Sequence, residues 1–309
     1  FASFACGGCH QLIPGVPSMG PNLSDVGSRL STSEIYEALL DPAAVVDPAY
    51  APFATLMPLT LGGNGFYDRM TADDYRALVA WLAAKTGGNE TVQAMAKRHP
   101  KEYLFGANEV PDLPDMQKEL EKYLRAGAVI IGEQKFKVPC DSKFVWAVAE
   151  VAQEFSVPML LHFQHNTYNI GIENFHKTLE KFPKVNFIGH AQAWWGNIDK
   201  KHIQKINYPQ GKVTPGGITD KLLSNYENMF GDLSAGSGLN ALIRDEAHTK
   251  EFFDRHQNQL LYGSDCADAI GRGPGCQGSR TIDAVRRISK TKKIERKLLF
   301  ENSKKLFKL

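Results

Sequence analysis

The chain has 309 residues, of which 43% are hydrophobic and 23% charged, and its formal net charge is +2 at pH 7. This composition is typical of a globular protein with one large domain or two unequal ones. The small net charge, without a run of basic residues interleaved with aromatic ones, argues against nucleic-acid binding. No apolar run approaches 18 residues, so we expect no membrane span.

The two ends of the chain differ in charge. Residues 1–88 carry four basic and eight acidic side chains, whereas the whole chain carries 36 and 34. The first part is therefore net −4 and the rest net +6, which predicts two units of different origin, 1–88 and 89–309. The chain begins at Phe1 rather than at an initiator methionine. We therefore expect a processed or trimmed product, in which any export signal is already gone.

A C-x-x-C-H run opens the chain as Cys6-Gly7-Gly8-Cys9-His10. In this spacing the two thiols can form thioethers with haem vinyl groups while the adjacent imidazole binds the iron. Zinc is the alternative, but it needs three or four protein ligands, and the first 98 residues contain no other Cys or His. We also see no βαβ context for a thioredoxin-like redox pair. The run therefore predicts covalent haem c on Cys6, Cys9 and His10.

The sixth iron ligand is expected to be a methionine thioether, which raises the reduction potential relative to a second imidazole. Met57, in the Met57-Pro58 dipeptide, is the candidate because it lies downstream of a proline-rich loop and ahead of a final helix. Met19 and Met70 are the alternatives, since a single methionine is more often a packing residue than a ligand.

Two helices are predicted in this first part. Ser31-Thr32-Ser33-Glu34 is a capping box that predicts a helix ending at Leu40. Thr71 is expected to cap a second helix, which ends before Gly87-Gly88. The apolar stripe of this second helix consists of Tyr75, Leu78, Val79 and Leu82.

Residues 1–86 resemble small c-type cytochromes. The resemblance rests on the C-x-x-C-H run, Gly20-Pro21-Asn22-Leu23, Met57-Pro58 and the closing helix. It implies an all-α cytochrome c domain with His10 and Met57 as axial ligands of the iron. It also implies electron transfer to a redox partner protein in the periplasm or another exported location.

From Thr91 onward, short β-rich apolar runs alternate with helical stretches. This alternation is typical of a parallel sheet covered by helices. Helices are predicted over residues 116–126 and 144–155. Six strands are expected, at residues 103–110, 128–136, 157–163, 186–191, 229–234 and 260–265.

Four of these strands end in a residue that suits metal binding or proton transfer: Glu133, His162, His190 and Asp265. In a (β/α)₈ barrel the C-terminal strand ends meet at one pocket, so residues far apart in sequence come together there. A single histidine at a strand end is as often structural as functional. Four polar strand ends favour a site. Glu133 is expected to be a ligand or the partner of one, because an unpaired buried charge is costly.

The second part resembles the metal-dependent amidohydrolases related to aminocarboxymuconate semialdehyde decarboxylase and the hydroxybenzoate decarboxylases. The resemblance implies an α/β TIM-barrel-like domain in which His162 and Asp265 bind Zn or Mn. His190, Asp265 and Glu133 would be the catalytic residues, acting on a small organic substrate by hydrolysis or non-oxidative decarboxylation. The residues that carry it are Gly132-Glu133, Leu161-His162, Ile188-Gly189-His190, Gly231-Asp232-Leu233-Ser234, Gly263-Ser264-Asp265 and residues 301–307.

The sequence departs from that family at the start of the barrel. The family begins with a His-x-His pair on its first strand, and no such pair occurs here. The first two strands are therefore expected to be missing, through a real loss or through faulty joining of two sequences. Six strands would leave two open edges, which could pair with another chain.

Three further groups are open to two interpretations. His165 is either a replacement ligand or a substrate-loop residue. Trp194 and Trp195 either form an aromatic wall for the substrate, in loops above the barrel, or pack in the core. Cys266 and Cys276 bracket a glycine-rich loop and could form a disulfide, which would leave Cys140 unpaired.

The leading hypothesis is an exported haem c module fused to a metal-dependent hydrolase or decarboxylase. The rival is a functional cytochrome joined to an inactive, metal-poor barrel fragment that serves as a scaffold. A third possibility is a ligand-binding module that reports through the haem.

Overall fold

The computed structural model describes residues 6–12, 19–24, 26–30, 32–42, 50, 56–83, 88–266 and 276–309. The chain folds as two compact units, Phe1–Met116 and Gln117–Leu309, so residues 89–116 group with the first unit. Among the residues described, no helix is both long enough and apolar enough to cross a membrane.

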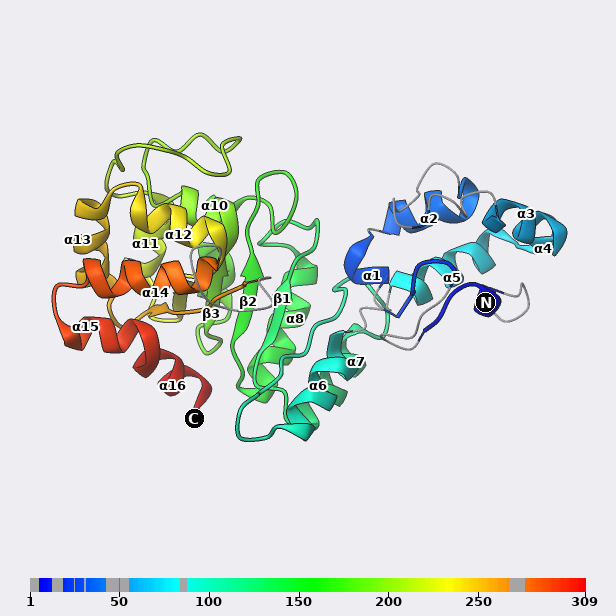
Figure 1. The fold of residues 1–309 in the computed structure, drawn as a ribbon, viewed down its shortest axis with the longest axis horizontal. Helices are drawn as coiled ribbons and strands as arrows, with labels where there is room; N and C mark the ends of the chain where they lie inside the picture. Colours follow the sequence, from blue (N-terminus) through cyan, green and yellow to red (C-terminus); the bar gives the residue numbers. More distant parts are fainter. Residues whose placement is uncertain are drawn as a thin grey trace. The chain divides into compact units, whose positions relative to one another are not determined.

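In the first unit the described regular elements are helices (Figure 1), followed by an irregular segment over residues 99–115. Its helices surround one apolar core, in which Phe66 and Val79 are almost fully buried. The other buried members of this core are Val26, Ile35, Leu39, Leu61 and Leu82. The elements are η2 (Cys6–Gly8), α1 (Val26–Arg29), α2 (Thr32–Leu40), α3 (Leu56–Gly63), α4 (Phe66–Arg69), α5 (Ala72–Ala83) and α6 (Gly88–Arg98), and α7 (Met116–Arg125) begins at the unit boundary.

The predicted helices of the first unit are present. Helix α2 ends at Leu40 as expected, and Ser31 of its capping box lies outside the described residues. Helix α5 begins with a reciprocal cap, in which the Asp74 N–H donates to Thr71 Oγ1 at 3.1 Å and the Thr71 N–H donates to Asp74 Oδ2 at 3.0 Å. Two such bonds satisfy backbone donors that a helix start otherwise leaves unpaired.

The strand expected at residues 103–110 is absent from the structure. Ala107 forms only an isolated β-bridge, and side chains bond the backbone groups of two other residues of this segment. Asn89 accepts a hydrogen bond from the Asn108 N–H at 2.9 Å and donates one to the Asn108 carbonyl at 2.7 Å. The Val110 N–H donates to the carboxylate of Glu109 at 2.8 Å. Phe105, Ala107 and Val110 are buried, whereas Tyr103 and Leu104 are exposed, and the segment is irregular.

The second unit is built on a five-stranded parallel sheet in the order β1-β2-β3-β4-β5. The strands are β1 (Ile131–Gln134), β2 (Met159–His162), β3 (Phe187–His190), β4 (Met229–Asp232) and β5 (Leu260–Leu261). Strands β2 and β3 are in register, with His162 opposite His190. The five strands correspond to the last five of the six expected. In the part of the chain that the structure describes, they form an open sheet with β1 and β5 at its edges rather than a closed barrel.

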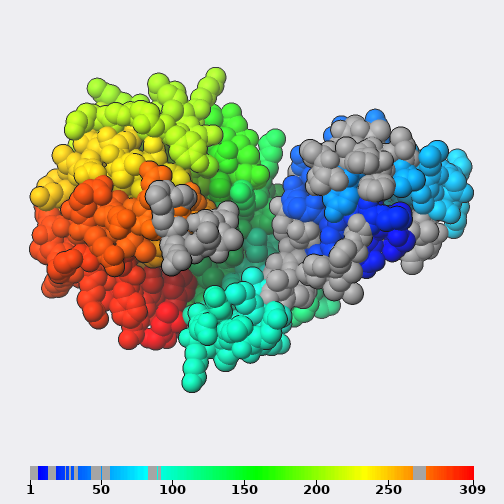
Figure 2. All heavy atoms as spheres, in the orientation of Figure 1, coloured from blue at the N-terminus to red at the C-terminus, as the bar shows by residue number. Residues whose placement is uncertain are grey.

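Helices flank this sheet (Figure 1), with α11 against β4 and α16 against β5. The predicted helices at 116–126 and 144–155 are present as α7 and α8 (Lys143–Phe155). The space-filling view shows the last helices together on the surface of this unit (Figure 2). The remaining elements are η4 (Ile172–Asn174), α9 (His176–Lys181), α10 (Ala191–Gly196), α11 (Ile218–Asn225), α12 (Ala235–Ile243), α13 (Glu246–His256), α14 (Gln277–Ile288), α15 (Lys292–Arg296), η5 (Lys297–Glu301) and α16 (Asn302–Phe307).

A buried carboxylate joins α11 to α13. Asp220 accepts hydrogen bonds from Arg255 Nη2 at 3.1 Å and from His256 Nε2 at 2.6 Å. Burial acts to raise the pKa of Asp220, but these two partners outweigh it and hold the pKa at about 2, below the ordinary value of 3.8. A carboxylate with a depressed pKa stabilises the fold above its unfolded-state pKa, and this stabilisation disappears as the pH falls through the folded-state value.

We therefore expect Asp220 to contribute roughly 2 kcal/mol at neutral pH, lost as the pH falls from about 4 to about 2. Urea unfolding of the wild type and of Asp220→Asn between pH 5 and pH 3 measures this contribution. The free energy of unfolding should fall less steeply in the variant. Asp254→Asn is the control, because the Asp254 ion pair with Lys290 is solvent-exposed. Equal slopes in the wild type and Asp220→Asn would contradict the assignment.

Candidate metal centre

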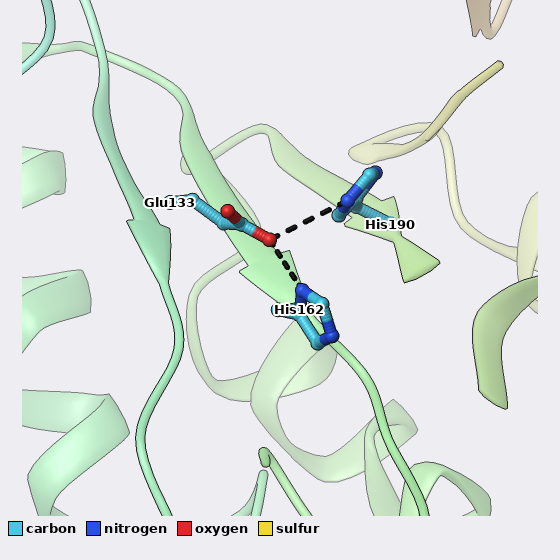
Figure 3. A group of neighbouring side chains, drawn as sticks. All are labelled: Glu133, His162 and His190. Atoms are coloured by element: carbon cyan, nitrogen blue, oxygen red, sulfur yellow. Dashed lines mark hydrogen bonds and ion pairs between the residues drawn. The ribbon is translucent and has the colours of Figure 1, made fainter. Parts of the chain in front are cut away.

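Three side chains converge at the C-terminal ends of the first three strands (Figure 3). Glu133 comes from β1, His162 from the end of β2 and His190 from the end of β3. Each offers one ligand atom, and the three atoms lie within 4.8 Å of one another. Glu133 Oε1 accepts a short hydrogen bond from His162 Nδ1 and lies 3.4 Å from His190 Nε2. Parallel pairing of neighbouring strands therefore brings together residues that are far apart in sequence.

This donor set fits a divalent transition metal. Imidazole nitrogen with carboxylate oxygen is the ligand combination that proteins use for zinc, and imidazole also binds other first-row metals. His162 and His190 are both buried, with 5% and 4% of their surface exposed. Buried imidazoles that face a shared carboxylate are oriented toward one point, as a metal site requires.

The orientation of His190 is fixed from behind by β4. His190 Nδ1 donates to Asp232 Oδ2 at 2.9 Å, which leaves Nε2 facing Glu133. Asp232 itself is held by Ser234, whose N–H donates to Oδ1 at 3.1 Å and whose hydroxyl donates to Oδ2. Gly263 allows this approach, because a Cβ there would lie 2.7 Å from Asp232 Oδ1.

The end of β2 is tied to the end of β1. The side chain of Asn169 is buried and donates to the carbonyls of Gln134 at 2.7 Å and His162 at 2.9 Å. The second ring nitrogen of His162 lies 3.3 Å from Gln164 Oε1. The Tyr168 ring packs edge-on against the His162 ring. These contacts hold His162 on the side where Glu133 lies.

The charges of the site reinforce one another. Burial raises the pKa of Glu133, but the hydrogen bond from His162 and the charge of His190 outweigh it, so the pKa is lowered overall. Burial lowers the pKa of His190, but the hydrogen bond and charge of Asp232, followed by the charge of Glu133, raise it overall. The carboxylates thus create the negative potential that attracts a cation.

Asp265 lies at the rim of the site. Its Oδ2 is 3.9 Å from His190 Nε2, and its side chain is 60% exposed. Burial raises the pKa of this carboxyl, and His190 opposes the shift. The backbone at Asp265 has a φ of 43°, in the left-handed region that non-glycine residues rarely adopt. The structure therefore places the four predicted strand-end residues at one edge of the sheet, with three of them in contact.

Replacing Asp232 should weaken metal binding at this site. Asp232→Asn keeps the shape of the side chain but removes the charge that orients His190. Partners of metal-binding histidines typically account for 10- to 100-fold in metal affinity. We expect Mn²⁺ to bind about tenfold more weakly to Asp232→Asn than to the wild type in isothermal titration calorimetry. Asp283→Asn, on the exposed side of α14, is the control. Unchanged affinity in Asp232→Asn would contradict the role of Asp232.

The remaining predicted residues lie outside the three-residue cluster. His165 is half-buried, in the segment after β2. Trp194 and Trp195 lie in α10, not in a loop above the sheet, and only 0% and 2% of their surface is exposed. Trp195 Nε1 donates to the Asp232 carbonyl at 2.8 Å, and the Trp194 ring packs against Gly189 of β3. Of the two interpretations that the sequence left open for these tryptophans, their burial in α10 favours core packing.

The first unit places its C-x-x-C-H residues in one tight turn. The Cys6 carbonyl accepts hydrogen bonds from the Cys9 N–H at 3.2 Å and the His10 N–H at 2.9 Å. His10 Nδ1 donates to the Pro21 carbonyl at 2.7 Å. A carbonyl can only accept, so the Nδ1–H tautomer is the one that forms this bond, and the lone pair of Nε2 is left for a metal.

The three candidate methionines of the first unit differ in their environment. Met57 lies in α3 and packs, partly buried, against the apolar core on which Cys6 also packs. Met70 packs against the same core, directly after α4. Met19 is 53% exposed. Packing with Cys6 on one core keeps Met57 and Met70 as candidates, and the exposure of Met19 disfavours it.

Sequence reasoning missed the residues that orient the ligands. Asp232 was quoted only as part of a motif, although it is the partner of His190, and Ser234, Asn169 and Gln164 had no predicted role. One signal was available for Asp232, because it is a fifth polar residue at the end of a predicted strand. The hydrogen bonds of Asn169 join two strand ends and have no counterpart in the sequence pattern.

Comparisons with known proteins identify the fold. No protein-family model matches the sequence, and no curated protein matches it. The probable 2-pyrone-4,6-dicarboxylic acid hydrolase of Acinetobacter baumannii, with citric acid bound, is 14% identical, with 72% of this chain and 79% of that chain covered and a TM-score of 0.51. An apo structure from Agrobacterium tumefaciens is 16% identical, with 77% and 85% covered and a TM-score of 0.50.

A third solved structure is the 5-carboxyvanillate decarboxylase of Novosphingobium aromaticivorans complexed with manganese and 4-hydroxy-3-methoxy-5-nitrobenzoic acid. It is 12% identical, with 90% of this chain and 92% of that chain covered and a TM-score of 0.47. At identities this low, the likenesses with TM-scores of 0.50 and 0.51 concern the fold alone. They show that the chain shares with these two structures an α/β fold built on a parallel sheet.

Proposed function

We propose that the second unit is a metal-dependent enzyme that hydrolyses or non-oxidatively decarboxylates a small organic substrate. The observation that carries this proposal is the cluster of Glu133, His162 and His190 at the C-terminal ends of adjacent parallel strands. Folds of this kind place their reactive groups at that edge of the sheet. Burying ionisable side chains next to one another costs folding free energy, so clusters of this kind are concentrated at functional sites.

Glu133, His162 and His190 would hold a divalent ion, Zn or Mn. Such an ion supplies Lewis acidity, which polarises a substrate oxygen or makes a bound water more acidic. Asp232 keeps Nε2 of His190 directed at the centre. Asp265, whose pKa is raised by burial, lies 3.9 Å from His190 Nε2 and is suited to hold or release a proton there.

Lys135 supplies a positive charge next to these carboxylates. Its Nζ lies 5.5 Å from the centre of the Tyr168 ring, and its charge lowers the pKa of Glu133. A cation beside a metal centre suits a substrate that carries a carboxylate, because both groups attract the same anion.

A panel of candidate substrates tests the proposal. The Mn²⁺-loaded full chain should release CO₂ from a hydroxybenzoate such as 2,6-dihydroxybenzoate, or open the ring of 2-pyrone-4,6-dicarboxylic acid. His190→Asn should abolish the activity that is found, while His176→Ala, at the start of α9 and outside the cluster, should retain it. Metal binding without turnover on either class would favour the rival interpretation of a ligand-binding or scaffold domain.

We propose that the first unit is an electron-transfer module that carries covalent haem c. The observation that supports this proposal is the hydrogen bond from His10 Nδ1 to the Pro21 carbonyl, because it leaves the lone pair of Nε2 for an axial bond to iron. Cys6 and Cys9 lie in the same turn and would form the thioethers, and Met57 or Met70 would be the second axial ligand. The haem would supply one-electron chemistry, with the second ligand setting its potential.

Covalent haem attachment accompanies export, so we propose a periplasmic or otherwise exported location with a redox partner protein. Acidic side chains among the described part of residues 1–88 would favour a partner with a basic surface. They include Asp68, Asp73 and Asp74. Electron transfer to such a partner should slow as the ionic strength rises.

A further inference from the structure

We propose that Cys266 and Cys276 form a reversible disulfide that fixes the backbone at Asp265 and thereby strengthens metal binding at the neighbouring centre. The link to metal binding rests on the proposed function of the second unit, whereas the disulfide itself does not. The bond would make the site responsive to the redox state of its surroundings.

The two sulfur atoms are already in contact. Their separation is 2.9 Å, shorter than an ordinary non-bonded sulfur contact and about 0.9 Å longer than a disulfide bond of about 2.05 Å. Cys276 is 2% exposed, and its Sγ accepts the Ser279 N–H at 3.4 Å at the start of α14. Cys266 is half-buried, so it is the more accessible of the two.

Both ends of the bond would act on Asp265. Cys266 is its direct neighbour, and Gln277, which follows Cys276, donates a short hydrogen bond from Nε2 to the Asp265 carbonyl. The same two segments pack closely at Ser264 and Gly278, where a Cβ on the glycine would lie 2.6 Å from Ser264 Cβ. A covalent link across this contact would hold the end of β5 against α14.

Fixing this backbone matters because of the conformation of Asp265. Its φ of 43° is seldom populated by a non-glycine residue, so the surroundings must hold it. In that conformation the carboxylate lies 3.9 Å from His190 Nε2, within reach of an ion held by the cluster. A pre-positioned carboxylate binds a cation more tightly than one that must first be ordered.

The bond would form by exchange with a small-molecule disulfide such as oxidised glutathione. The more exposed Cys266 sulfur attacks one sulfur of that disulfide, which forms a mixed disulfide and releases one glutathione thiol. Cys276 then attacks the Cys266 sulfur, and the second glutathione thiol leaves. Two electrons pass from the protein to the glutathione disulfide, and both protein thiol protons go to the released thiols or to water.

The first test maps the bond. The full chain is equilibrated with reduced or oxidised glutathione, blocked with iodoacetamide, digested and analysed by mass spectrometry. We expect a peptide that joins Cys266 to Cys276 only in the oxidised sample. Cys140 is the internal control, because it is fully buried and its thiol donates to the Gly171 carbonyl at 2.9 Å. Alkylation of both Cys266 and Cys276 in the oxidised sample would overturn the proposal.

The second test measures Mn²⁺ affinity by isothermal titration calorimetry in the two states. We expect about tenfold tighter binding in the oxidised wild type than in the reduced wild type. Cys276→Ser should bind like the reduced form in both samples, and Cys140→Ser should behave like the wild type. A disulfide with equal affinities in both states would overturn the coupling. A disulfide with no Mn²⁺ binding in either state would overturn the coupling together with the proposed enzymatic function.

Discussion

The full chain, loaded with Mn²⁺ or Zn²⁺ and then desalted, should retain about one equivalent of that metal in addition to the iron of the proposed haem. His162→Ala should lose it, with affinity falling on the order of 100-fold or more, because removing a ligand costs more than the 10- to 100-fold typical of a ligand's partner. The physical reason is that His162 and His190 hold two buried nitrogens against one carboxylate oxygen, Glu133 Oε1. Inductively coupled plasma mass spectrometry measures the metal, and visible absorbance counts the haem separately.

His176→Ala is the matched control for this experiment. His176 also lies in the second unit, but it is half-buried at the start of α9, and its Nδ1 contacts the nearby Glu173 carbonyl at 3.0 Å, outside the strand-end cluster. The control should keep its metal, and circular dichroism should show equal folding of both variants. A wild type that retains no metal, or a His162→Ala variant that retains all of it, would mean that the strand-end cluster does not bind an ion.

Much of this site could be predicted because strand ends are visible in the sequence. A buried parallel strand is a short apolar run, so the polar residue that ends it stands out in the sequence. His162 does so at the end of β2, and His190 does so at the end of β3. Parallel pairing then brings those ends to one edge without further information. Helix starts were predictable for a similar reason, because the Thr71 and Asp74 cap is a local pattern.

The failures arose where side chains from distant segments decide the outcome. Residues 103–110 have the composition of a strand, but the side chain of Asn89, which lies 19 residues before Asn108, satisfies the backbone groups of Asn108. The two tryptophans follow His190 directly, and the sequence could not show that α10 turns them into the core. Asp232 was passed over because its partner, His190, lies 42 residues away in the chain.

The largest effect expected in the first unit concerns its haem. If the proposed haem is present, the chain matured in an exporting host should show a Soret band and keep its porphyrin after acid–acetone extraction, because two thioethers would hold it covalently. His10→Ala should disrupt axial ligation most severely. The hydrogen bond from Nδ1 to the Pro21 carbonyl leaves the lone pair of Nε2 for the iron, and the variant lacks this nitrogen. A Cys6→Ala, Cys9→Ala double variant should lose covalent retention altogether. The pyridine haemochrome spectrum measures both results.

Cys140→Ser is the control for the two thiols, since Cys140 is fully buried in the second unit and should not affect the haem. Replacement of the second axial ligand distinguishes the methionines, because losing a thioether ligand should lower the reduction potential of the haem. Met57→Ala should show this change if Met57 is the ligand, whereas the exposed Met19 should be replaceable without effect. Matured wild-type protein without covalent porphyrin would refute the haem assignment, and with it the argument for export.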